Sequence, residues 1–336
     1  MFGILDMDRK IRVGVVGLGK MGILHSALLN VISGVELAAL CDKNRMIVKY
    51  ARKIVPKVPV VEHIRKLKEM DLDAVFVTTP IPTHLSVIRD IYLRDVCKHV
   101  FVEKTLASTY KESVELCQLA KAAGGVAMVG YQKRFAVTFR KLSELLAYGV
   151  LGRVEGFHAY AYSSDFIGLN DSAGDRRGGV LRDLGSHVVD LALNLFGDME
   201  VCASHVTSMD RAGLRRLWQF KTLSNGGFYG QFSVSWSMPG YRLPEVGLSI
   251  FGSSGSVRAS DDMIELTVDG EISRWFKQSL QDNVAFLLGQ PEYFREDLSF
   301  IRCIQGGQIP DVDFDSGSRV DRIIAEVELK AETRWI

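Results

Sequence analysis

With 336 residues, the chain is long enough for two domains and a sizeable hydrophobic core. Its formal net charge is only +1 and its basic residues are scattered, which argues against nucleic acid or a membrane surface as a partner. The five cysteines are dispersed, no apolar run approaches the roughly 20 residues of a transmembrane helix, and no group of ligands has metal spacing. We therefore expect a cytoplasmic protein with reduced thiols and no metal.

The first strong pattern predicts a strand, a glycine turn and a helix. Apolar residues dominate 11–16, which is typical of a buried parallel strand. A complete G-x-G-x-x-G follows, and apolar residues at helical spacing come after it. Gly17 would allow the tight turn, Gly19 would let a pyrophosphate approach the backbone, and Gly22 would let the helix pack close to the strand. The candidate dinucleotide-binding residues of this turn are Gly17, Leu18, Gly19, Lys20, Met21 and Gly22.

An acidic residue stands where such a turn needs one. The apolar run 35–41 ends at Asp42, 20 residues beyond the last glycine of the turn. At this spacing an acidic side chain is expected to bind the adenine ribose hydroxyls. Capping of a helix predicted over 44–54 is the alternative. An acid disfavours a 2′-phosphate, so NAD is preferred, while Lys43 and Arg45 keep NADP open.

Strands and helices keep alternating up to about residue 130. We expect strands over 58–61, 74–78, 99–102 and 126–129, and helices over 62–70, 83–94 and 109–123. Repeated strand–helix units predict a parallel, doubly wound α/β sheet of Rossmann type, which we assign to residues 1–129.

Residues 130–336 have a different pattern. Helices are expected over 137–148, 184–196, 291–303 and 319–333, and strands over 154–162, 201–209, 217–223, 228–237, 245–251, 256–259 and 264–268. Strands without intervening helices imply an antiparallel sheet. Phe228, Phe232, Val234 and Trp236 alternate along one strand and predict a buried face, which a partner subunit is one candidate to cover.

Three polar stretches carry the chemistry. Thr79-Pro80 to His84 and Glu103-Lys104 each follow a strand of the parallel sheet, and open α/β sheets bind ligands at the carboxyl ends of their strands. In the third stretch, 178–190, Asp183 precedes His187 by four residues, so that a helix would present both on one face.

Together these stretches resemble the glucose–fructose oxidoreductase / inositol dehydrogenase family (Gfo/Idh/MocA). The resemblance runs nearly end to end and includes residues 17–22, 79–84, 103–104, 130–135, 178–190, 250–256 and the closing helix from Glu292. It implies a Rossmann domain, a C-terminal α/β domain with a large, mostly antiparallel open sheet, and an active site between them. Members mostly oxidise or reduce a carbinol carbon of a sugar, cyclitol or similar polyol with NAD(P). Many are dimers or tetramers joined through the open sheet face.

The resemblance matches the family's catalytic residues to Lys104, Asp183 and His187, with Thr105 where the family usually has proline. The chemistry is reasonable by itself, because alcohol oxidation needs a base for the hydroxyl proton and a cation for the alkoxide-like oxygen. His187 would be the base, Lys104 the cation, and Asp183 would orient the imidazole or bind another hydroxyl. The alternatives are a helix cap for Asp183, pairing of His187 with Asp190, and a solvated loop for Lys104.

The remaining candidates are assigned by position. Cofactor contacts are expected from Arg45, Thr79, Pro80, His84, Glu103, Lys104 and Gln132, and substrate contacts from Lys104, Arg134, Arg177, Asp183 and His187. A core or capping role is the alternative for His84, a surface position for Arg134, and a solvated loop for Arg176 and Arg177, which otherwise suit an anionic substrate group.

The main functional expectation is an NAD(P)-dependent dehydrogenase or reductase acting on a sugar-like secondary alcohol or its ketone. One alternative is an NAD-retaining sugar hydrolase or epimerase of the same fold. The other is a non-catalytic dinucleotide-gated sensor, against which the presence of Lys104, Asp183 and His187 argues.

Overall fold

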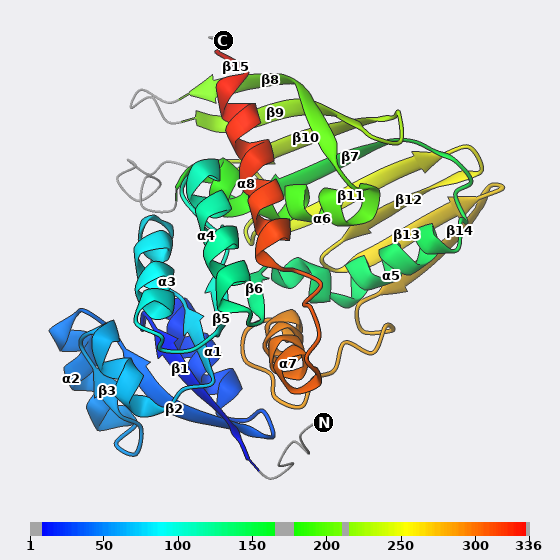
Figure 1. The fold of residues 1–336 in the computed structure, drawn as a ribbon. Helices are drawn as coiled ribbons and strands as arrows, with labels where there is room; N and C mark the ends of the chain where they lie inside the picture. The colour runs from blue at the N-terminus through cyan, green and yellow to red at the C-terminus, as the bar shows by residue number, and fades with distance from the viewer. Residues whose placement is uncertain (1–8, 165–177, 210–214, 334–336) are drawn as a thin grey trace. The chain divides into compact units, whose positions relative to one another are not determined.

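The computed structural model describes residues 9–164, 178–209 and 215–333. They form two compact units, each built on one β-sheet (Figure 1). Among the described residues, the first unit contains 9–107, 111–130 and 284–315, and the second contains 108–110, 131–164, 178–209, 215–283 and 316–333. Residues 284–315 thus return to the N-terminal part of the chain. The linear domain boundary at 129/130 stays a prediction.

The first unit contains a six-stranded parallel sheet with strand order β3-β2-β1-β4-β5-β6. Its strands are β1 (Ile11–Val16), β2 (Val35–Cys41), β3 (Val60–Val61), β4 (Ala74–Val77), β5 (His99–Glu103) and β6 (Ala127–Gly130). All four residues of β4 are fully buried, as expected of a parallel strand covered on both faces. The predicted doubly wound sheet is confirmed.

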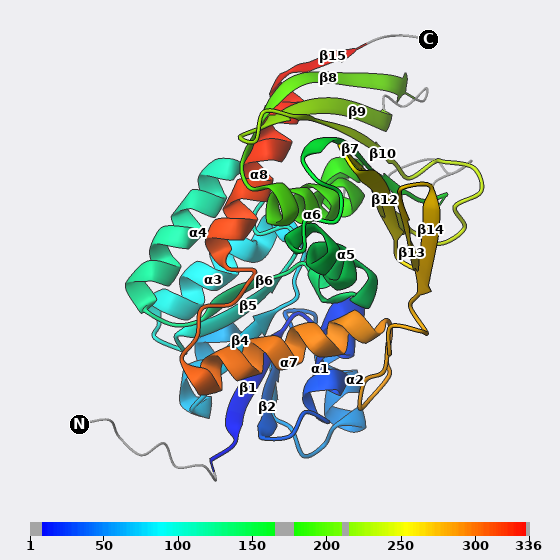
Figure 2. The same ribbon diagram turned by 90° about the vertical axis from the view of Figure 1, so that its right-hand side faces the viewer.

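The helices of this unit are α1 (Lys20–Leu29), α2 (Arg45–Ile54), α3 (His84–Leu93), α4 (Tyr110–Ala123) and α7 (Pro291–Gly306). Figure 2 shows α7 lying along α1. The helix expected over 62–70 is instead the 3₁₀ segment η1 (Ile64–Met70), which ends where Asp71 adopts a left-handed conformation with φ of 48°. A second 3₁₀ turn, η2 (Ile81–Thr83), precedes α3.

The second unit contains a nine-stranded sheet with strand order β14-β13-β12-β11-β7-β10-β9-β8-β15. Two neighbouring pairs, β10 with β7 and β15 with β8, are parallel and the others antiparallel. The predicted mostly antiparallel sheet is therefore confirmed. The strands are β7 (Val154–Tyr162), β8 (Met199–Met209), β9 (Arg215–Ser224), β10 (Tyr229–Ser235), β11 (Glu245–Gly252), β12 (Gly255–Ser260), β13 (Met263–Val268), β14 (Glu271–Phe276) and β15 (Ala331–Thr333).

The helical segments of the second unit are η3 (Gln132–Phe135), α5 (Val137–Ala147), the π turn η5 (Leu181–Gly185), α6 (Ser186–Phe196) and most of α8 (Phe314–Leu329). The expected helix over 319–333 is wrong at its end, because the chain leaves α8 after Leu329 and pairs with β8 as strand β15.

One face of this sheet packs on α6. Phe157 of β7 stacks on Phe196 of α6 with ring centroids 4.5 Å apart, and its ring lies 5.4 Å from that of Phe232. Phe232, Val234 and Trp236 are all at most 2% exposed. These three residues are already buried within one copy of the chain, so a partner subunit is not needed to cover them.

A buried charged cluster joins α7 to the parallel sheet. His25 of α1 donates from Nδ1 to Asp297 Oδ1 at 2.8 Å and from Nε2 to Glu103 Oε1 at 2.9 Å. The rings of Phe76 and Phe101 enclose it, with centroids 5.5 and 5.2 Å from that of His25. Burial alone would lower the pKa of His25, but the two carboxylates raise it well above 6.5, which favours the charged form of the ring.

A second carboxyl group on α7 shares this site. Glu296 is fully buried, and its oxygens have no hydrogen-bond partner among the described residues. Burial raises the pKa of Glu296 well above 4.5, and the carboxylates of Glu103, Asp297 and Glu292 raise it further while His25 opposes them. Burial also raises the pKa of Asp297, against the effect of His25. Folding therefore takes up protons at this cluster.

Stability should fall as the pH rises. A pKa that is raised on folding gives stability that is full below the unfolded pKa, near 4.3 for Glu, and lost as the pH rises through the folded pKa. Glu296→Gln is neutral at every pH, so its Tm should exceed that of the wild type by about 2 °C or more at pH 8, and the difference should shrink toward pH 5. Thermal denaturation followed by circular dichroism from pH 5 to 8.5 measures this.

The matched control for this experiment is Glu200→Gln, which neutralises an exposed carboxylate on β8 and should reproduce the wild-type pH profile. If the Tm of Glu296→Gln ran parallel to that of the wild type over the whole pH range, the inference that folding raises the pKa of Glu296 would be wrong.

Candidate active site

The turn between β1 and α1 has the backbone that a dinucleotide site requires. Gly17 has φ of +97°, and an added Cβ there would lie 2.9 Å from the Thr79 backbone nitrogen. A Cβ on Gly22 would lie 1.8 Å from the Gly17 carbonyl oxygen, so only glycine lets α1 start this close to the strand. Gly19, in contrast, is exposed, and a Cβ there would meet nothing within 4 Å. No side chain among the described residues caps α1, so its first N–H groups can bind phosphate oxygens.

Asp42 lies beside this turn. Its Oδ2 accepts a hydrogen bond from the Leu18 backbone N–H at 2.7 Å, and its Oδ1 accepts one from the Asn44 N–H at 2.7 Å. The side chain of Asn44 caps α2, so the capping alternative for Asp42 is wrong. The turn and the carboxylate therefore fit a dinucleotide, with remaining lone pairs on Asp42 for ribose hydroxyls. Arg45 is 88% exposed, and its Nε lies 3.5 Å from Glu62.

His84 ties together the two polar segments of this sheet edge. Its ring is fully buried, with Nε2 2.8 Å from the Thr79 carbonyl oxygen and Nδ1 3.0 Å from that of Thr105. Burial lowers the pKa of His84. This geometry favours the core alternative, in which His84 holds the backbone on either side of the site. Direct contact of His84 with a cofactor stays a prediction, as it does for Thr79, Pro80 and Arg45.

Lys104 follows the last residue of β5. It is half-buried, and its backbone N–H donates to Glu103 Oε2 at 3.2 Å. Thr105, which takes the place of the family's usual proline, is fully buried and follows Lys104 through a cis peptide bond. Its hydroxyl donates to the Ala107 carbonyl at 3.3 Å. The residues on either side of Lys104 are buried, and the catalytic role of its own side chain stays a prediction.

Asp183 and His187 lie on consecutive helical segments of the second unit. The chain already has helical backbone angles at Val180, so Asp183 stands inside the π turn η5 and not at a helix start, and the capping alternative is wrong. His187 lies in the first turn of α6, is 6% exposed, and meets the ring of Tyr131 edge-on at 6.4 Å. π turns occur frequently at functional sites, but apolar spacing in a sequence gives no sign of one.

Arg134 is not a surface residue. Its side chain is 8% exposed, with Nε donating to Asp190 Oδ2 at 2.8 Å and Nη1 to Asn194 Oδ1 at 3.0 Å. Asp190 therefore pairs with Arg134, in place of the pairing with His187 considered from the sequence. Gln132, in the same 3₁₀ segment, is 6% exposed. Substrate contact by Arg134 and cofactor contact by Gln132 stay predictions, and Arg177 lies outside the described residues.

One buried ion pair was missed by the sequence analysis. Lys133, between Gln132 and Arg134, is 5% exposed, and its Nζ lies 2.7 Å from Asp261 Oδ1. This pair anchors η3 to the turn between β12 and β13. Its members are far apart in the chain, so no local pattern could have joined them.

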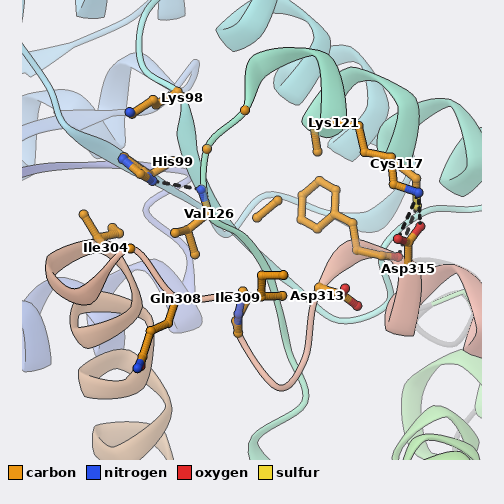
Figure 3. Close-up of a pocket in the computed structure, with 17 residues that line it drawn as sticks. Lys98, His99, Cys117, Lys121, Val126, Ile304, Gln308, Ile309, Asp313 and Asp315 are labelled. Atoms are coloured by element: carbon orange, nitrogen blue, oxygen red, sulfur yellow. Dashed lines mark hydrogen bonds and ion pairs between the residues drawn. The ribbon is translucent and has the colours of Figure 1, made fainter.

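A cavity of about 490 Å³ lies elsewhere in the first unit (Figure 3). His99 and Val126 line it at the amino ends of β5 and β6, and the ion pair between Lys121 and Asp315 closes one side at 2.9 Å. The glycine turn and Lys104 are at the carboxyl ends of their strands, so this cavity is separate from the candidate site. Within the described residues, no group of His, Cys, Asp or Glu is arranged to hold a metal ion, and no helix is long and apolar enough to cross a membrane.

Comparison with known proteins agrees with this geometry. Residues 11–131 match the oxidoreductase family with an NAD-binding Rossmann fold, and residues 139–258 match the GFO/IDH/MocA C-terminal domain. The uncharacterized oxidoreductase YdgJ of Escherichia coli is 32% identical over 199 residues, which span 57% of this chain and 55% of that protein. Myo-inositol 2-dehydrogenase of Thermotoga maritima is 25% identical over 91% of this chain and 92% of its own length.

The fold has solved counterparts. Levoglucosan dehydrogenase in complex with NADH and L-sorbose superposes with a TM-score of 0.83, at 18% identity, over 96% of this chain and 98% of that one. At this identity the likeness shows the shared fold.

Asp42→Ala should weaken the binding of NADH about 10-fold, because ribose hydroxyls lose a charged acceptor, a loss of about 1.4 kcal/mol. Binding of NADPH should change little. Titrations followed by nicotinamide fluorescence measure both affinities, and Asp90→Ala, on the surface of α3, is the control. A wild-type protein that bound NADPH 10-fold more tightly than NADH would contradict the role of Asp42 and favour Lys43 and Arg45 as 2′-phosphate ligands.

Proposed function

This chain belongs to the Gfo/Idh/MocA family of oxidoreductases, and we propose that it transfers hydride between NAD(P) and a secondary alcohol or ketone of a sugar, cyclitol or related polyol. The observation that carries the proposal is the shared sheet edge of the first unit, where the glycine turn, Asp42 and Lys104 all follow parallel strands. The named activities of the relatives on myo-inositol and levoglucosan support the polyol class.

NAD(P), when bound, supplies the hydride acceptor or donor at its nicotinamide ring. The residues of the chain bind the cofactor and the substrate, stabilise the developing charge and transfer the proton. The start of α1 binds the pyrophosphate and Asp42 the adenine ribose. Lys104 holds the reacting oxygen of the substrate and stabilises its negative charge. His187 takes the hydroxyl proton during oxidation, and Asp183 orients the imidazole or binds a second hydroxyl.

A panel of polyols, sugars and sugar acids, each with NAD and with NADP, tests the proposal through absorbance of the reduced nicotinamide. On the best substrate, Lys104→Met should lower turnover by ~10²-fold or more, as expected for the loss of one preorganised donor. His187→Asn should also lower turnover, and the acid limb of its pH–rate profile should vanish because the base is gone.

Lys111→Met removes an exposed lysine from α4 and is the control for the first variant. Affinity for NADH should change little in all three proteins, since the glycine turn and Asp42 are unaltered and Lys104 is only one of several expected cofactor contacts. Near-wild-type turnover in both Lys104→Met and His187→Asn would contradict the mechanism, and copurified NAD that is not consumed would favour a hydrolase or epimerase.

We also propose a cytoplasmic homodimer or homotetramer. The dispersed thiols, three of them buried, suit a reducing compartment. The association surface is the sheet face opposite α6. Backbone pairing places Tyr229, Phe251 and Ile272 in one row across this face, and they are 49, 51 and 53% exposed. Large apolar side chains gathered on an open sheet face are typical of an interface.

Sedimentation velocity at micromolar concentration should show a dimer or larger species. The double variant Phe251→Lys, Ile272→Lys should sediment as a monomer, because each charge would be buried in the interface. Ile309→Lys, at an 82% exposed position of the first unit, should leave the assembly intact. A monomeric wild type would contradict the proposed surface.

A further inference from the structure

His25 makes two contacts that lead in different directions. Through Nδ1 it meets Asp297 of α7, at 2.8 Å from Oδ1 and 3.0 Å from Oδ2. Through Nε2 it meets Glu103 Oε1 at 2.9 Å, while the other oxygen of Glu103 accepts the backbone N–H of Lys104 at 3.2 Å. A continuous set of hydrogen bonds therefore runs from α1 through Glu103 to the peptide group of Lys104.

We propose that His25 is a positioning residue that fixes Lys104, through Glu103, at a set distance from the dinucleotide-binding start of α1. The inference rests on the proposed function, since it gives Lys104 its purpose. It also explains why the buried imidazole of His25 lies at this position on α1. His25 lies six residues after Gly19 on the same helix, so a rigid α1 connects the phosphate-binding turn to the Glu103 carboxylate.

The environment makes this connection stiff. His25 is fully buried, and Glu103 is 8% exposed. A buried carboxylate cannot exchange its partner for water without a large desolvation cost, so Glu103 keeps one orientation as long as the imidazole is there. Glu103 then accepts the Lys104 backbone N–H with its second oxygen. This hydrogen bond fixes the backbone of Lys104, from which the side chain with its ammonium group extends.

The competing explanation is that His25 only fastens α7 to the sheet through Asp297. The two ring nitrogens allow these roles to be separated. In His25→Gln the side-chain amide nitrogen takes the place of Nε2 and can still donate to Glu103, while the contact with Asp297 is lost. In His25→Asn the amide nitrogen takes the place of Nδ1 and can still donate to Asp297, while the contact with Glu103 is lost. Both variants lose the positive charge.

Three measurements are made on both full-length variants and the wild type: Tm, NADH affinity with steady-state kinetics on the best polyol, and hydrogen exchange of the peptide spanning residues 103–107. The Tm of both variants should be lower than that of the wild type.

His25→Asn should have a kcat ~10-fold or more below that of His25→Gln, with a similar substrate KM, because the displaced cation acts on the transition state. The Lys104 amide should also exchange ~10-fold faster in His25→Asn than in His25→Gln, because the loss of Glu103's partner frees the acceptor of that amide.

Equal kcat and equal exchange in the two variants would overturn the proposal and leave His25 as a fastener of α7. If the wild type turned over no polyol while the exchange difference persisted, the proposed function would fail and the positioning of the Lys104 peptide would stand. Should His25→Asn not fold, His25→Met replaces it in the comparison with His25→Gln, because methionine has a similar length but donates to neither carboxylate. Exchange at Lys104 should then be faster in His25→Met than in His25→Gln, and equal exchange in the two would overturn the proposal.

Discussion

The close approach of α1 to the carboxyl ends of the parallel strands is the constraint on which the candidate site depends. Two missing side chains permit it, because a Cβ at Gly17 or Gly22 would overlap backbone atoms of the turn or of the segment after β4. This approach places the uncapped helix start beside Asp42, and it also brings His25 within reach of Glu103. The glycines thus serve the nucleotide site directly and the Lys104 segment indirectly.

The charged cluster around His25 is not needed for packing alone. Phe76 and Phe101 stack with centroids 4.5 Å apart, and Phe300 of α7 meets Phe76 edge-on at 5.3 Å, so aromatic contacts already hold this helix on the sheet. Buried ion pairs add little net stability over well-packed apolar groups, but they allow only one arrangement of donors and acceptors. In this cluster the hydrogen bonds lead from His25 through Glu103 to the peptide N–H of Lys104. Their main contribution is therefore to fix the position of that peptide group.

Local patterns were sufficient wherever one segment determined its own structure. Apolar runs gave β1, β2 and β7 with their observed bounds, and the spacing from the glycine turn identified Asp42. Segments whose structure depends on distant partners were missed. The chain returns to the first unit only at Val284, so the contact of His25 with Asp297 joins residues 272 positions apart. The sequence analysis placed Arg134 after the last strand of the parallel sheet but did not predict its ion pair with Asp190, because the two residues are far apart in the chain.

The two groups of candidate catalytic residues are held by different physical means. In the first unit, two buried histidines fix the Lys104 segment through hydrogen bonds: His84 to the Thr105 carbonyl, and His25 to Glu103. In the second unit, helical segments position the candidate residues. Asp183 lies on a π turn, and the ion pair of Arg134 with Asp190 fixes the helix that carries His187. The residues that hold the Lys104 segment, His25 and His84, are different from those that form the glycine turn and contact Asp42. The loss of Lys104 positioning should therefore lower turnover without abolishing the binding of NADH.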